Sequence, residues 1–161
     1  MSVQINKAMY TREQASQIRQ DFWMRFGKYL LPILSSEGEK VNWVNYKTGI
    51  RNLFFRMNVT KDFAEISIDI MHRDPAYAKQ LFQQFVMLRA ALEIQTGEPW
   101  VWEESAQDEH GQPLSRIYRR QEGQNIFRQE DWPAIISFLK PRIIALDAFW
   151  CDYKMLFEMI N

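Results

Sequence analysis

Cysteine, glycine and proline are scarce in this chain, and long apolar runs are missing. The single cysteine, Cys151, excludes an intrachain disulfide, so a packed core must hold the fold together. Six glycines and six prolines exclude collagen-like and low-complexity sequences. No run approaches the roughly 20 apolar residues of a membrane helix, and the first residues lack the apolar segment of a secretory signal. We therefore expect a cytoplasmic protein with no membrane partner.

An excess of charge of either sign is also missing. Twenty basic residues balance twenty acidic ones, so no global field attracts nucleic acid or an anionic membrane. The two histidines are far apart in sequence, which gives no support for a Cys/His zinc site. The sequences Gly-x-Ser-x-Gly, Walker A and Gly-x-Gly-x-x-Gly do not occur. We accordingly expect no metal, no cofactor and no catalysis.

The composition is otherwise that of one globular domain. The 161 residues are 47% hydrophobic and 25% charged, which matches ordinary soluble proteins. Aromatic residues make up 14%, including six tryptophans. We expect a single domain over residues 1–161, with residues 1–10 as a flexible tail.

Three segments have helical periodicity. A capping box and regularly spaced apolar residues predict a first helix over about residues 12–31. Asp74, followed by proline, predicts the start of a second helix that ends at Gly97. A long third helix begins near Trp132 and continues to the end of the chain, with a kink at Pro141.

Strand patterns fill the remaining segments. Alternation of apolar and polar residues is clearest over residues 63–71, where one face is isoleucine-rich and the other polar. The other expected strands cover residues 41–46, 50–59, 100–104 and 114–120. The fold class is therefore α+β, in the order α-β-β-β-α-β-β-α. We expect a five-stranded, mostly antiparallel sheet packed by three helices, with a long, kinked C-terminal helix.

Two carboxylates on the polar face of strand 63–71 are candidates for catalysis. Glu65 and Asp69 flank Ser67, and the element order is that of restriction-endonuclease-like nucleases. Those enzymes need an acid-x-Lys sequence to hold Mg²⁺ and activate water, but serine replaces the lysine here. A degenerate nuclease that also uses Glu103 remains the third hypothesis.

Basic residues interleaved with aromatic residues form the main binding hypothesis. Such a surface can pair with phosphates and stack bases. Residues 1–80 carry 12 basic and 8 acidic residues, and the second half carries the reverse. Alternatively, Glu103 and Glu104 neutralise arginines across a hairpin. The nucleic-acid-binding candidates are Lys47, Arg51, Arg56, Arg116, Arg119 and Arg120, with Tyr46 and Tyr118 as stacking platforms.

The terminal helix is the basis of a second hypothesis, a protein-interaction module. It is longer than the sheet of a small domain needs for cover. Phe149, Met155 and Met159 follow one flank, which we expect to be exposed. That flank favours a homodimer or a contact with another protein.

Several segments resemble a known family. They are residues 43–50 (Trp-Val-Asn-Tyr-Lys-Thr-Gly-Ile), 130–136 and 140–147, with shorter matches at residues 22–27 and 115–118. With these segments the chain resembles an uncharacterised bacterial domain-of-unknown-function family. Its short stand-alone members are typical of Bacteroidetes, and related domains occur at the carboxyl end of longer, restriction- or nuclease-associated proteins. The resemblance implies no activity, but it favours an accessory module associated with nucleic acid.

Overall fold

The computed structural model describes residues 10–160; of the tail expected over residues 1–10, only Tyr10 lies within them. The described helices are α1 (Arg12–Leu30), α2 (Pro75–Met87), α3 (Arg89–Thr96) and α4 (Trp132–Glu158), with a short 3₁₀ helix, η2 (Gln129–Asp131). The strands are β1 (Leu53–Val59), β2 (Phe63–Met71), β3 (Val101–Gln107) and β4 (Pro113–Glu122). In this part of the chain, no helix is long and apolar enough to cross a membrane.

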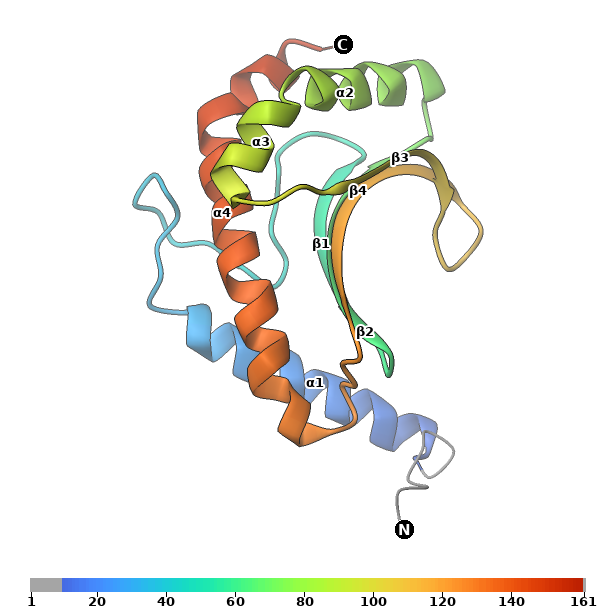
Figure 1. The fold of residues 1–161 in the computed structure, drawn as a ribbon, viewed down its shortest axis with the longest axis vertical. Coiled ribbons are helices and arrows are strands. Elements are labelled where there is room, and N and C mark those ends of the chain that lie inside the picture. Colours follow the sequence, from blue (N-terminus) through green and yellow to red (C-terminus); the bar gives the residue numbers. More distant parts are fainter. Residues whose placement is uncertain (1–9, 161) are drawn as a thin grey trace.

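The four strands form one antiparallel sheet in the order β1-β2-β4-β3. The alternation predicted for residues 63–71 is present in β2, where Ala64, Ile66, Ile68 and Ile70 are fully buried. These side chains join the core formed with α2 and α4. Figure 1 shows the helices gathered on one side of the sheet, which curves away from them. Among residues 10–160, no helix covers the other face of the sheet.

The α+β class and the long C-terminal helix are confirmed, but the prediction of five strands is wrong. Residues 41–46 are not a strand. Asn42 instead accepts a hydrogen bond from the backbone N–H of Asn45 at 3.1 Å, which makes a turn. Trp43 is buried and donates its indole N–H to the carbonyl of Ile33 at 3.0 Å. The apolar residues of this segment therefore anchor an irregular loop one at a time instead of lining a sheet.

The prediction of three helices is also wrong, because the segment between Asp74 and Gly97 contains two. The predicted start and end are confirmed: Asp74 caps α2, and Gly97 ends α3 with a left-handed φ of 76°. The break falls at Leu88, whose φ and ψ of −100° and 12° leave the helical region. The break lets α2 pack on β2 while α3 packs on α4. No glycine or proline lies at this position to signal it.

The last helix remains one continuous element through Pro141. Beside the proline, Arg142 donates to the carbonyl of Phe138 at 2.8 Å and forms a paired hydrogen bond with Glu98 at 2.7 and 2.9 Å. Phe149, which we expected on the exposed flank, is fully buried because nearly the whole first half and middle of the helix pack into the core. Met155 and Met159 are exposed, at 72% and 75%.

Candidate binding site on the open face of the sheet

The polar face of β2 is the floor of a groove that the helices do not cover. In the strand register Arg56 lies beside Ser67, which lies beside Tyr118, and these positions share this face. The neighbouring rows place Asp69 beside Arg116 and Glu65 beside Arg120. The tip of the β3–β4 hairpin bends over this side of the sheet (Figure 1). We call this hollow of about 750 Å³ the sheet-face groove.

Asp69 is the centre of the first charge cluster in the groove. Its side chain is almost fully buried and accepts two hydrogen bonds from Arg116, to Nε at 3.0 Å and to Nη2 at 3.3 Å. Arg56 Nη1 adds a third at 3.3 Å. Burial by itself lowers the pKa of Arg116, but the hydrogen bond and charge of Asp69 outweigh it, so the pKa is raised. Both guanidinium groups are therefore charged and held in fixed orientations.

Glu65 is the centre of the second cluster. One carboxylate oxygen accepts from Arg120 Nε at 2.9 Å and from Nη2 at 2.6 Å. The Arg120 guanidinium also lies over the ring of Phe63, 4.1 Å from its centroid. In the same way Arg56 lies 4.2 Å from the ring centroid of Phe54. Each of these two arginines is thus fixed by a carboxylate along one edge and by an aromatic ring along one face.

The outer edges of these guanidinium groups still face the groove. The side chains of Arg56, Arg120 and Arg116 remain 44%, 33% and 19% exposed. Three guanidinium groups against two carboxylates leave the floor with one net positive charge. Asp108 and Glu109 at the rim add two carboxylates, and hydrogen bonds from the backbone N–H groups of Gln112 and His110 keep the pKa of Asp108 low. The groove as a whole therefore has no excess of positive charge, and what it offers an anionic group is a set of well-positioned donors.

The carboxylates of the nuclease hypothesis are not arranged as the ligands of a metal ion. Glu65 and Asp69 are both buried and both bound by arginines, and Ser67 is buried between them. Glu103 is exposed on β3 and lies opposite Arg116 in the register. Among residues 10–160 there is no group of three or more His, Cys, Asp or Glu side chains that could hold a metal ion.

Four of the eight nucleic-acid candidates share the groove face: Arg56, Arg116, Arg120 and Tyr118. Of the other four, Tyr46 lines the wall of the groove, and the remaining three lie elsewhere. Arg51 stacks on Tyr77 at 3.9 Å and pairs with Asp74 at 3.7 Å.

Arg119 points to the other face of β4 and pairs with Glu98 at 3.3 Å. Tyr46 donates its hydroxyl to the buried carboxylate of Asp147 on α4 at 2.7 Å. Lys47 lines a separate hollow beside that pair. These residues are thus distributed over several surfaces.

The acids that bind the arginines were missed by sequence reasoning. The alternative hypothesis paired Arg116 and Arg119 with Glu103 and Glu104, whereas Asp69 and Glu98 form the pairs. The sequence gives no signal for this, since α2, α3 and β3 lie between β2 and β4 in the chain. The aromatic partner Phe54 does have a signal in the sequence, because it lies two positions before Arg56 and therefore on the same face of the strand.

A serine–histidine pair beside the groove has a structural role. Ser115 donates its hydroxyl hydrogen to the carbonyl of Glu104 at 2.7 Å. His72 Nε2 lies 2.7 Å from the same hydroxyl oxygen. Between Glu103 and Ala106 the β3–β4 register shifts, so this bond satisfies a carbonyl that the ladder leaves free. Ser115 is buried, with its hydroxyl bound to this carbonyl.

Comparison with known proteins gives one match. Neither a curated protein nor a solved structure matches the chain significantly. One family model covers residues 18–154, which include every strand and most of the helical residues, and the predicted resemblance to a domain-of-unknown-function family is confirmed. The chain therefore belongs to the family described as Domain of unknown function (DUF4268).

Proposed function

We propose that the protein is a non-catalytic binding module that takes single-stranded nucleic acid in the sheet-face groove. One observation carries this proposal: three arginines on an uncovered sheet face are held in place by two buried carboxylates, with aromatic rings among them. Proteins that bind single strands combine cationic grooves with aromatic side chains on which bases stack.

The buried carboxylates support binding by fixing the guanidinium groups in advance. Arg116 uses Nε and Nη2 for Asp69, and Arg120 uses the same edge for Glu65. The remaining donors can bind phosphate oxygens without the entropy cost of ordering a free side chain. With Asp108 and Glu109 at the rim, the carboxylates cancel the charge of the three guanidinium groups, so we expect moderate affinity that depends on the positioned donors.

Two rings beside the arginines provide the stacking surface. Phe54 is 38% exposed at the edge of the sheet, and Tyr118 is half-buried on the same face, in β4. Stacking on a ring contributes about 1–3 kcal/mol per base and tolerates any sequence. We therefore expect little sequence preference.

The test is binding of short labelled single-stranded DNA, single-stranded RNA and duplex DNA, measured by fluorescence anisotropy across a salt series. Three arginine–phosphate contacts predict a slope of log K against log salt of about −2 for single strands, since each contact contributes about −0.7. Arg56→Gln is the variant of choice because Asp69 keeps its two bonds from Arg116. It should weaken binding and flatten the slope by about 0.7.

Arg51→Gln is the matched control. Like Arg56, Arg51 is an exposed arginine that stacks on an aromatic ring and pairs with an aspartate, but it lies outside the groove. Equal losses in the two variants, or no binding at low salt, would refute the proposal. Cleavage of the strand only when Mg²⁺ is present would favour a degenerate nuclease instead.

A further inference from the structure

A second hollow lies between α1 and the start of α4, away from the sheet-face groove. It encloses about 430 Å³, and we call it the helix pocket. Its walls include Tyr10, Asp21, Arg25, Lys28, Phe127 and Trp132. No residue of these walls also lines the sheet-face groove, so nothing argued for the groove bears on this pocket.

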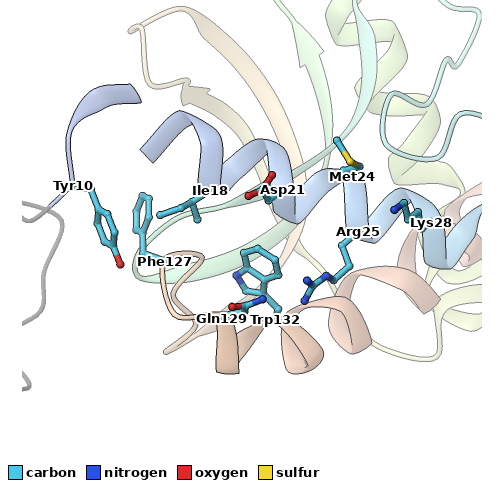
Figure 2. A pocket seen from close by; sticks show the side chains of 9 residues that line it. All are labelled: Tyr10, Ile18, Asp21, Met24, Arg25, Lys28, Phe127, Gln129 and Trp132. Carbon is cyan, nitrogen blue, oxygen red and sulfur yellow. The ribbon is translucent and has the colours of Figure 1, made fainter. Parts of the chain in front are cut away.

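The helix pocket has an aromatic end and a cationic end (Figure 2). Tyr10 and Phe127 stack at one end, with ring centroids 5.5 Å apart and planes 25° from parallel. Arg25 and Lys28 project from α1 at the other end, one helical turn apart. Trp132 lies between the two ends, and its indole N–H is already bound to the carbonyl of Ile126 at 2.7 Å.

The cations of the helix pocket differ from those of the sheet-face groove because no carboxylate of the described residues pairs with them. Within residues 10–160, neither Arg25 nor Lys28 has a carboxylate within 4 Å, although both are exposed. The Arg25 guanidinium rests over Trp132, 5.0 Å from the ring centroid. Asp21, one turn before Arg25, accepts a hydrogen bond from Gln17 at 2.8 Å. Two cations in this pocket are therefore not neutralised by a carboxylate of the described residues and can bind an anion.

We infer that the helix pocket binds a phosphate monoester carried on a planar aromatic group, as in a nucleotide. Arg25 and Lys28 would hold the phosphate through charge-assisted hydrogen bonds. The ring would pack against the Tyr10–Phe127 end, where aromatic contacts favour flat groups. Asp21 would accept a hydrogen bond from a ribose hydroxyl or an exocyclic amine. The volume falls within the range of about 300–1,000 Å³ typical of small-ligand sites.

The test is calorimetric titration of the full chain with adenosine monophosphate, adenosine, ribose 5-phosphate and inorganic phosphate. We expect adenosine monophosphate to bind at least about tenfold more tightly than each of its parts, because only it engages both ends. Lys28→Gln should reduce its affinity about tenfold and leave adenosine unaffected. Tyr10→Ala should weaken adenosine monophosphate and adenosine but not ribose 5-phosphate.

Arg12→Gln is the control, because Arg12 is an exposed cation of the same helix that does not line the pocket. Three results would overturn the inference. They are an absence of binding by adenosine monophosphate, equal binding of ribose 5-phosphate and adenosine monophosphate, and an equal loss in Arg12→Gln and Lys28→Gln.

A last comparison separates a free nucleotide from the end of a strand. In the Arg56→Gln background, an oligonucleotide with a 5′-phosphate should bind more tightly than the same strand with a 5′-hydroxyl if strand ends enter the pocket. Equal binding of the two strands, together with binding of adenosine monophosphate, assigns the pocket to free nucleotides. Arg56 lies outside the helix pocket. The comparison of the two strands therefore tests the helix pocket even if the sheet-face groove binds no nucleic acid.

Discussion

Replacing Asp69 with asparagine tests whether the ionic floor of the sheet-face groove also stabilises the fold. Asp69→Asn keeps the shape of the side chain and removes its charge. Arg116 loses a paired carboxylate partner, and Arg56 loses its only carboxylate partner within the described residues. Two guanidinium groups are then left close together on the sheet with no anion between them.

The expected cost follows from burial. Removing one partner of a fully buried ion pair costs about 3–5 kcal/mol. The Asp69 side chain is 2% exposed, but Arg116 and Arg56 are 19% and 44% exposed and keep part of their hydration. We therefore expect a loss of about 2–3 kcal/mol in the free energy of unfolding. For a domain of this length that corresponds to a fall in Tm of about 5–10 °C.

Urea unfolding followed by circular dichroism measures this loss. Asp62→Asn is the control, since Asp62 pairs with Lys61 at 2.9 Å on the surface and its side chain is 61% exposed. That variant should change stability by no more than about 0.5 kcal/mol. If Asp69→Asn shifts the unfolding midpoint no further than Asp62→Asn does, the reasoning about the buried cluster is refuted.

Three further predictions concern buried or partly buried polar groups elsewhere. Burial and the hydrogen bond to Asp147 raise the pKa of Tyr46 far above its ordinary value. Above about pH 10 the unfolded chain loses the hydroxyl proton of Tyr46 while the folded chain keeps it, so the free energy of unfolding falls as the pH rises. Tyr46→Phe should reduce that fall, as measured by urea titrations at several pH values. Ser115→Ala should cost about 1–3 kcal/mol by the same assay, since the Glu104 carbonyl loses its donor. Burial and the charge of Asp147 raise the pKa of Cys151 to about 11, so iodoacetamide should alkylate the native protein at pH 8 far more slowly than the unfolded chain, as mass spectrometry would show.

Two of these predictions have a matched control variant, and the third compares the native with the unfolded protein. Tyr29→Phe changes a tyrosine that is 55% exposed, and an equal effect on the pH dependence would contradict the role of Tyr46. Ser105→Ala removes an exposed hydroxyl from β3, and a loss equal to that of Ser115→Ala would show that the bulge needs no donor. Alkylation of Cys151 at the same rate in the native and unfolded protein would contradict its raised pKa.

Local signals predicted the ends of several helices. The capping box at Thr11 and Gln14 is present, with both reciprocal hydrogen bonds. These features depend on neighbours three or four residues apart, so the sequence contains them in full. The loop around Trp43 was assigned wrongly, because its apolar residues bind separate parts of the core. Residues that contact the core singly resemble a short strand in composition.

The candidate site could be predicted only in part. Arg56, Arg116 and Arg120 were singled out from their residue type and their aromatic neighbours. Their partners Glu65 and Asp69 were assigned to another chemistry, since nothing local shows that β4 lies beside β2. The helix pocket was not predicted at all, because it joins α1 to the connection between β4 and α4.

The sequence by itself determined the class of the fold, the alternation of β2 and the boundaries of α1, since these depend on periodicity and on short-range hydrogen bonds. The tertiary structure decided which charges meet. Strand order and register place Asp69 between Arg56 and Arg116, and the break at Leu88 directs α2 and α3 to different partners. Contacts of this kind join residues that are distant along the chain, and only the packing of the whole core fixes them.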